Sequence, residues 1–308
     1  MGSVLKDASS GLSLERAVKL MLVAFVLMTI GLAAFYVIDR YRYQNVSIVD
    51  REMQRLEELA RRDPENLAAR LAVADAYFMK KRYDQAITQY EQVLKADPDR
   101  VGTLIGLGFA YRGKGDIAKM EEAFKHAIEV STGDFAQFDA RLQMVNYYLG
   151  EAYLKHGEYD QSIERLQAAL KIKRTDADAL LLLGHAYQGK GEYGNAAGAY
   201  ATATEFVPDF VEAYQGMAAS FEKMGDAARA GYARGMVAFS KGDNAGALRQ
   251  LEEAASQATD EPIVVWGLAM AREKAGQKER AVEAYRRMLT LAPDYRPAID
   301  ALARLGAN

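Results

Sequence analysis

The most informative stretch of the sequence reads Leu183-Gly184-His185-Ala186-Tyr187 and continues shortly afterwards with Gly191-Glu192-Tyr193. Thirty-four residues earlier the chain reads Leu149-Gly150-Glu151-Ala152-Tyr153, followed by Gly157-Glu158-Tyr159. A further copy begins Leu107-Gly108-Phe109-Ala110-Tyr111 and reaches Gly115-Asp116. Self-similarity at a period of this length indicates a repeat architecture, in which each period supplies one small structural unit.

Each period predicts two short helices. Small residues such as Gly108 and Ala196 let neighbouring helices approach closely, while tyrosines such as Tyr111 fill the space between them. The pair Gly115-Asp116 predicts a helix end, because glycine takes the left-handed conformation that closes one helix and the acid favours the start of the next. One unit cannot bury its apolar face alone, so the units must stack.

The pattern resembles the tetratricopeptide repeat family over about residues 50–305. The resemblance implies an all-α fold, a right-handed superhelical solenoid of helix pairs whose first helices line a concave groove. Within residues 49–305 we expect a half-repeat cap over 49–62, repeats from about 65, 99, 135, 176, 209 and 261, an extra half-unit near 228–258 and a cap helix over 296–305.

Two irregularities interrupt the period. Eight extra residues between Ser131 and Val145 predict a first helix lengthened by two turns, with Phe135, Phe138 and Leu142 along it. Beyond Gly225-Asp226 the pattern shifts by seventeen residues, which is half a unit. The helix over 228–240 is therefore predicted to serve two units at once.

An uncharged stretch of nineteen residues lies near the amino terminus and contains Leu20, Phe25, Ile30, Phe35 and Ile38. This length suffices to cross a hydrocarbon core as a helix. We therefore predict a tail over 1–19, a transmembrane helix over 20–38 and a juxtamembrane linker over 39–48. The alternatives are a cleaved signal peptide, disfavoured by the long polar lead-in, and a buried core helix, disfavoured by the unbroken hydrophobicity.

The side of the membrane follows less directly from the sequence. Lys6, Arg16 and Lys19 precede the stretch while Arg40 and Arg42 follow it, so the positive-inside rule gives a near tie. A short tail before a first span resembles a signal anchor, which favours repeats outside the cytoplasm. We expect a single-pass protein of a bacterial inner (plasma) membrane, with the periplasmic side favoured for the repeats.

Composition and motifs argue against several classes of function. The net charge is −3 with interspersed acids and bases, which argues against nucleic-acid binding, and there is no cysteine to form disulfides or thiolate sites. The glycine-rich runs 108–115 and 184–191 lack the Ser/Thr of a phosphate-binding loop. His126, His156 and His185 lie in separate units without metal-site spacing. We expect no cofactor, no metal and no enzymatic activity.

The family resemblance implies which residues would contact a partner, since first helices line the groove. Carried over, the concave face comprises Leu71, Asp75, Phe78, Met79, Ile105, Phe109, Arg112, Tyr147, Glu151, Leu154, Leu181, His185 and Gln188. Bulky apolar groups beside a few charges suit an amphipathic or extended peptide. Alternatively, some of these side chains pack against neighbouring units. Family members that clamp a terminal carboxylate use lysine and asparagine where this chain has Asp75, Phe109 and Glu151, so no such clamp is expected.

Together these features predict a membrane-anchored scaffold or assembly factor that holds a protein partner, itself membrane-associated, in the concave groove. The anchor would raise the local concentration beside such partners. Two alternatives remain: a structural accessory subunit of a membrane complex, and a periplasmic chaperone-like accessory of secretion or envelope assembly. A fixed stoichiometry after purification would favour the subunit. The pattern does not predict an oligomeric state.

Overall fold

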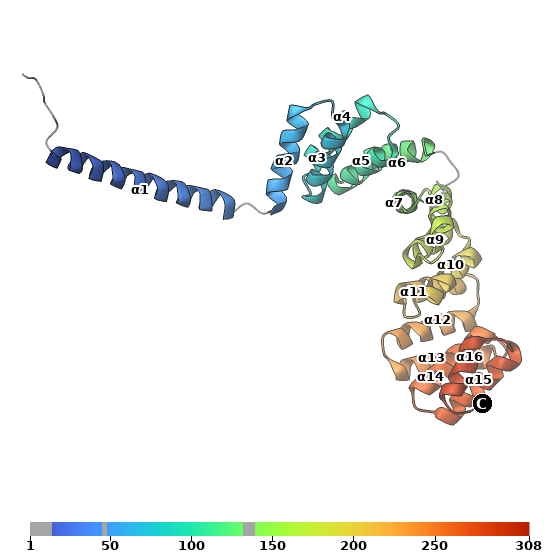
Figure 1. Ribbon diagram of the computed structural model, residues 1–308. Helices are drawn as coiled ribbons and strands as arrows, with labels where there is room; N and C mark the ends of the chain where they lie inside the picture. Colours follow the sequence, from blue (N-terminus) through green and yellow to red (C-terminus); the bar gives the residue numbers. More distant parts are fainter. Residues whose placement is uncertain (1–13, 45–47, 132–138, 308) are drawn as a thin grey trace, which may run out of the picture. The chain divides into compact units, whose positions relative to one another are not determined.

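Helices make up all the regular secondary structure in the part of the chain that is described (Figure 1). The structure, a computed structural model, describes residues 14–44, 48–131 and 139–307, with side chains in 18–40, 50–131 and 139–307. The chain divides inside α4 (Tyr83–Ala96) into two compact units, residues 1–93 and 94–308, each considered by itself. The prediction of an all-α repeat fold is confirmed.

The first helix, α1 (Leu14–Gln44), contains the apolar stretch. Its segment Val18–Arg40 has a mean hydropathy of 2.5 and no buried side chain, so by length and composition it is a candidate membrane span. The helix continues through residues 39–44, which corrects the linker predicted there. The physical reason is that no glycine or proline between Ile38 and Gln44 interrupts it.

The rest of the first unit packs α2 (Ile48–Arg62) against α3 (Leu67–Met79). The Tyr77 hydroxyl donates to Glu57 Oε1 at 2.7 Å and so ties the two helices together. Asn66 caps α3 by accepting a hydrogen bond from the Ala69 amide at 2.9 Å.

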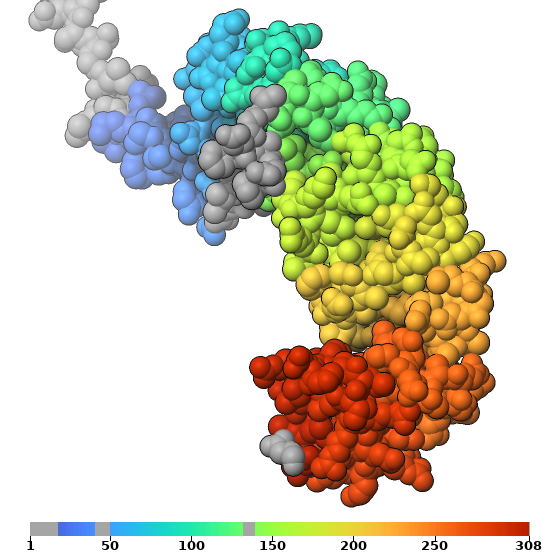
Figure 2. Space-filling view, turned by 90° about the vertical axis from the view of Figure 1, so that its right-hand side faces the viewer, coloured from blue at the N-terminus to red at the C-terminus, as the bar shows by residue number. Residues whose placement is uncertain are grey.

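The second unit stacks the remaining helices in chain order. Figure 2 shows that residues 139–307, coloured from green to red, follow a curve. They are α5 (Val101–Lys114), α6 (Ile117–Glu129), α7 (Ala140–His156), α8 (Tyr159–Ile172), α9 (Ala177–Lys190), α10 (Tyr193–Phe206), α11 (Val211–Lys223), α12 (Ala227–Ser240), α13 (Asn244–Gln257), α14 (Pro262–Lys274), α15 (Lys278–Leu291) and α16 (Arg296–Arg304).

Contacts between the two helices of a pair depend on small residues. A Cβ added to Gly184 of α9 would lie 2.4 Å from Cε1 of Tyr200 in α10, a distance that real Cβ atoms do not reach. Gly235 of α12 is in the same situation against Leu251 of α13, at 2.5 Å. Glycine therefore sets how closely the paired helices approach one another.

Helix α12 has two roles in the stack, as a second helix beside α11 and as a first helix beside α13. Contacts between alternate helices join α7 to α9 and α9 to α11, and then join α12 to α14. The first helices of successive units are thus α7, α9 and α11 before the shift, and α12 and α14 after it. This is the structural form of the half-unit shift in the sequence.

Helix α7 differs from its prediction. Phe135 and Phe138 lie outside the described residues, and α7 begins only at Ala140, with Asp139 as its N-cap. At 17 residues against the 14 of α5, it is longer by less than one turn instead of two. Asp139 accepts hydrogen bonds from the Arg141 amide at 2.8 Å and the Arg141 guanidinium at 2.7 Å, which fixes the helix start there.

Candidate functional site

In the first unit, the predicted groove residues lie along one face of α3, at positions 71, 75, 78 and 79. Leu71 and Phe78 are half-buried, whereas Asp75 and Met79 are exposed, Met79 to 80%. Asp75 Oδ1 accepts a hydrogen bond from the Tyr90 hydroxyl at 2.6 Å. Burial and this bond raise the pKa of Tyr90. Met79 is therefore the apolar side chain of this set that is most available to a partner.

In α5 the predicted apolar contacts are largely occupied by the protein itself. Ile105 is only 5% exposed and belongs to the core, which corrects its assignment to the binding face. The ring of Phe109 packs edge-on against Phe124 at 5.1 Å and Tyr148 at 5.6 Å between centroids. The alternative of packing between neighbouring units thus applies to Phe109, through its contact with Tyr148 of α7.

The remaining predicted groove residues of α5 and α7 include two charged side chains, Arg112 and Glu151, that contact each other. The Arg112 guanidinium lies 3.9 Å above the Tyr148 ring centroid and 3.6 Å from Glu151 Oε2. Glu151 also pairs with Lys155 at 2.8 Å. Tyr147 is half-buried, and its ring packs edge-on against the Tyr148 ring. Burial is the largest cause that raises the pKa of Tyr147 to about 12, followed by the nearby carboxylates of Asp178 and Glu151. Leu154 is half-buried.

Helix α9 presents a mixed surface at the predicted positions. Leu181 packs against the hydrophobic core that surrounds Tyr200, and the His185 ring meets the Tyr200 ring edge-on at 5.6 Å. Burial lowers the pKa of His185. Gln188 Oε1 accepts from the Tyr200 hydroxyl at 3.2 Å. These three half-buried residues therefore all contact Tyr200 or the core around it.

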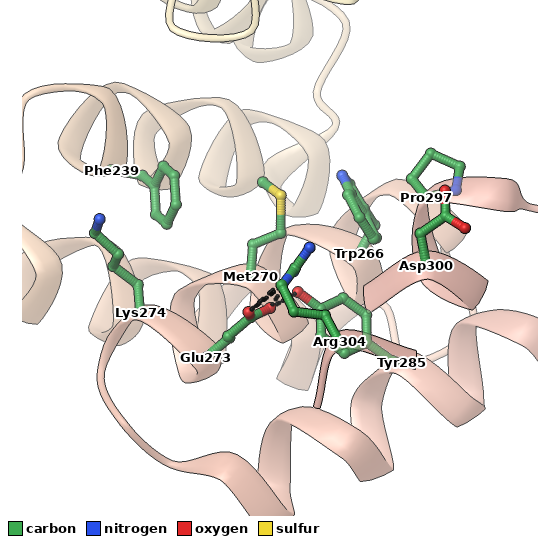
Figure 3. A pocket seen from close by; sticks show the side chains of 9 residues that line it. All are labelled: Phe239, Trp266, Met270, Glu273, Lys274, Tyr285, Pro297, Asp300 and Arg304. Atoms are coloured by element: carbon green, nitrogen blue, oxygen red, sulfur yellow. Dashed lines mark hydrogen bonds and ion pairs between the residues drawn. The ribbon is translucent and has the colours of Figure 1, made fainter. Parts of the chain in front are cut away.

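A pocket of about 660 Å³ lies among helices α12, α14, α15 and α16, near the carboxyl-terminal end of the second unit (Figure 3). We call it the α14 pocket, after the helix that supplies more of its lining residues than any other. It is lined by Phe239 of α12, Trp266, Met270, Glu273 and Lys274 of α14, Tyr285 of α15, and Pro297, Asp300 and Arg304 of α16.

The α14 pocket is not among the features predicted from the sequence, although the spacing of its wall residues was a usable signal. Trp266, Met270 and Glu273 precede the closing glycine Gly276 by the same numbers of residues by which Leu181, His185 and Gln188 precede Gly191. Extending the groove positions beyond the fourth repeat would have found the pocket wall. In the cap helix α16, Asp300 precedes Gly306 by six residues, as Met270 precedes Gly276.

The wall of the α14 pocket is held in place by its neighbours. The Trp266 ring packs against Tyr285 at 5.5 Å and edge-on against Tyr295 at 5.1 Å. Tyr285 donates its hydroxyl proton to Glu273 Oε2 at 2.6 Å, and burial followed by this bond raises the pKa of Tyr285. Arg304 pairs with the same carboxylate at 2.9 Å. The half-buried faces of Trp266 and Met270 are thus presented on a rigid support.

A second hollow, of about 500 Å³, lies between α11, α12 and α13. Its apolar lining consists of small side chains such as Ala218, Ala219 and Val237, and the Glu222–Arg234 ion pair stands beside them. Unlike the α14 pocket, it has no aromatic side chain in its lining. No cluster of three metal-ligating side chains occurs among the described residues.

Comparisons with known proteins agree with the repeat pattern. Sequence models described as tetratricopeptide repeat match residues 53–108, 101–134, 177–209 and 232–296, and one described as TPR repeat matches 150–191. No protein with a curated description matches the chain in sequence.

Similar solved structures include the MamA protein, which is 28% identical with a TM-score of 0.53 over 59% of this chain and 95% of that one. YrrB, described as a TPR protein with an unusual peptide-binding site, is 15% identical with a TM-score of 0.50, covering 80% of this chain and 96% of its own. Part of a TPR repeat-containing protein from Cytophaga hutchinsonii is 18% identical with a TM-score of 0.52, covering 87% and 98%. The last two likenesses concern the fold alone.

Proposed function

Because this chain belongs to the tetratricopeptide repeat family, we propose that it is a protein interaction scaffold that binds a partner polypeptide on its first helices, chiefly at the α14 pocket. The observation that carries this proposal is the pocket itself: about 660 Å³, with half-buried Trp266, Met270 and Phe239 in its lining. Half-buried aromatic and methionine side chains on a rigid support are typical of binding hot spots. The peptide-binding site in the description of YrrB is in keeping with such a role.

The candidate groove around α5, α7 and α9 has a different part in this proposal. Since Phe109 and Tyr147 are packed against other rings, the groups that remain for a partner are mainly polar, with Arg112 and Glu151 among them. Such groups direct orientation and specificity more than affinity. The α14 pocket would supply the affinity.

We further propose that α1 spans a membrane and holds the repeats at its surface. The support is the apolar segment Val18–Arg40, whose side chains are all exposed among the described residues. A helix of this hydropathy is unfavourable in water and favourable in a bilayer. Tethering would raise the effective concentration near membrane-associated partners, and we keep the periplasmic side for the repeats as part of this proposal.

Photo-crosslinking tests the binding role. A photoreactive residue at Met270 of the full-length protein in native membranes is expected to capture a partner, whereas one at the exposed Glu283 of α15 should not. The captured protein is then purified and its binding measured against the wild type and against Met270→Arg, which places a charge in the pocket. Equal binding to both proteins would contradict the proposed role of the α14 pocket.

A further inference from the structure

The α14 pocket contains four charged side chains, of which only two are paired with each other. Glu273 and Arg304 form an ion pair at 2.9 Å. Lys274 and Asp300 form no ion pair and no side-chain hydrogen bond within the described part of the chain. Figure 3 shows Lys274 and Asp300 on opposite sides of Met270 and Trp266. The pocket therefore has a free positive group at one end and a free negative group at the other.

The paired charges cannot take over the recognition of a ligand. The Glu273 carboxylate already accepts hydrogen bonds from Arg304 and from the Tyr285 hydroxyl. A ligand that displaced either donor would leave a carboxylate with 24% exposure short of a partner, which is costly. Lys274 and Asp300 are free of this constraint, so they are the charges that can select among ligands.

Between these two charges the lining is apolar. Trp266 is fixed by the rings of Tyr285 and Tyr295, and Met270 and Phe239 lie on the Lys274 side of it in Figure 3. A flexible thioether next to two aromatic faces accommodates bulky aliphatic or aromatic side chains of different shapes. The centre of the pocket thus favours one large apolar side chain.

We propose that the α14 pocket selects an extended peptide segment with one bulky apolar side chain flanked by an acidic residue and a basic residue. The acidic residue pairs with Lys274 and the basic residue with Asp300. A segment with charges of a single sign is attracted at one end and repelled at the other, so it binds less well. This inference rests on the proposed function and specifies its ligand.

The protein contains a built-in reporter for this test, because Trp266 is its single tryptophan. The probes are synthetic peptides with a central leucine, glycine-serine spacers and ends that carry Glu and Lys, Glu and Glu, Lys and Lys, or Gln and Gln. Binding to the full-length protein in mild detergent is followed by anisotropy of the labelled peptide, and occupation of the pocket by a change in Trp266 emission. We expect the mixed-charge peptide to bind about three- to tenfold more tightly than either single-sign peptide.

Charge reversal then assigns each end. Lys274→Glu is expected to shift the preference toward the Lys and Lys peptide, and Asp300→Lys toward the Glu and Glu peptide. Lys171→Glu is the matched control, since Lys171 also lies in the last turn of its helix, α8, but does not line the pocket. It should leave the order of affinities unchanged.

The outcomes separate this inference from the proposed function. If the peptides bind, change Trp266 emission and lose affinity in Met270→Arg, but show no charge preference, the charge selection is overturned while the binding role stands. If no peptide binds and Trp266 emission stays constant, both are overturned. A preference for the mixed-charge peptide that Lys274→Glu shifts toward the Lys and Lys peptide and Asp300→Lys shifts toward the Glu and Glu peptide supports both.

Discussion

Arg304 of α16 and Glu273 of α14 are joined by a bidentate contact: Arg304 Nη2 lies 2.9 Å from Oε1 and 3.0 Å from Oε2 of the carboxylate. Arg304 Nε adds a third bond, to Oε1, at 3.1 Å. The pair connects the cap helix to the first helix of the last repeat, across the wall of the α14 pocket. It therefore contributes to the position of α16 as well as to the shape of the pocket.

Replacing Arg304 by alanine should loosen the cap helix. Because the Arg304 side chain is 62% exposed, we expect only about 0.5–1 kcal/mol lower stability, together with faster amide exchange in α16. Arg304→Lys should restore little, since an ammonium cannot make the bidentate contact. Hydrogen exchange followed by mass spectrometry measures both. Arg296→Ala on the same helix is the control, and equal exchange in the two alanine variants would contradict the role of the pair.

Two glycines in neighbouring helices should respond to alanine in opposite directions. In Gly184→Ala the new methyl group would meet the Tyr200 ring at 2.4 Å, and Tyr200 is fully buried, so the ring cannot move aside cheaply. Overpacking of this kind costs about 1–3 kcal/mol. In Gly198→Ala nothing lies within 4 Å, and the better helix propensity should stabilise α10 by about 0.5–1 kcal/mol. Urea denaturation of both variants checks the two signs, and a loss of stability in Gly198→Ala would contradict this account.

These glycines also show why much of the fold could be predicted from the sequence. A helix end at Gly115-Asp116 requires only local chemistry: Gly115 has φ of 85°, and Asp116 accepts from the Lys119 amide at 3.2 Å. Both features follow from the residue types. The half-unit shift could be predicted for the same reason, because Gly242-Asp243 punctuates the chain as Gly225-Asp226 does.

The binding face could be predicted only in part, because it depends on packing between units. Ile105 and Tyr147 occupy equivalent places in their helices, yet Ile105 is buried and Tyr147 is half-buried. The difference comes from how each first helix meets the next one, which the repeat period does not specify. The α14 pocket needs the cap helix α16 as a further wall, so a single repeat could not reveal it.

His185 should make stability depend on pH in the mildly acidic range. Burial lowers its pKa below the ordinary value of 6.5, so the unfolded chain takes up the proton at a higher pH than the folded protein does. The stability contribution is therefore present above pH 6.5 and lost as the pH falls toward the folded-state pKa. Urea denaturation between about pH 7 and about pH 5 should show this fall, and His185→Gln should reduce it. In the control His126→Gln, on α6, the fall in stability that is due to His185 should remain. If His185→Gln showed the same pH dependence as the wild type, the fall could not be due to His185.

A charge placed in α1 should have an effect that depends on its position if the helix spans a membrane. Leu27→Arg puts a guanidinium near the middle of Val18–Arg40, where it would oppose insertion by about 2.5–3.5 kcal/mol. Leu20→Arg makes the same substitution near the end of the segment, where the side chain can extend to the interface at little cost. Extraction of membranes with alkaline carbonate should therefore release more of the Leu27→Arg protein than of the Leu20→Arg protein. Equal release would contradict a spanning helix, and a mature protein shown by mass spectrometry to begin after residue 38 would identify the segment as a signal sequence instead.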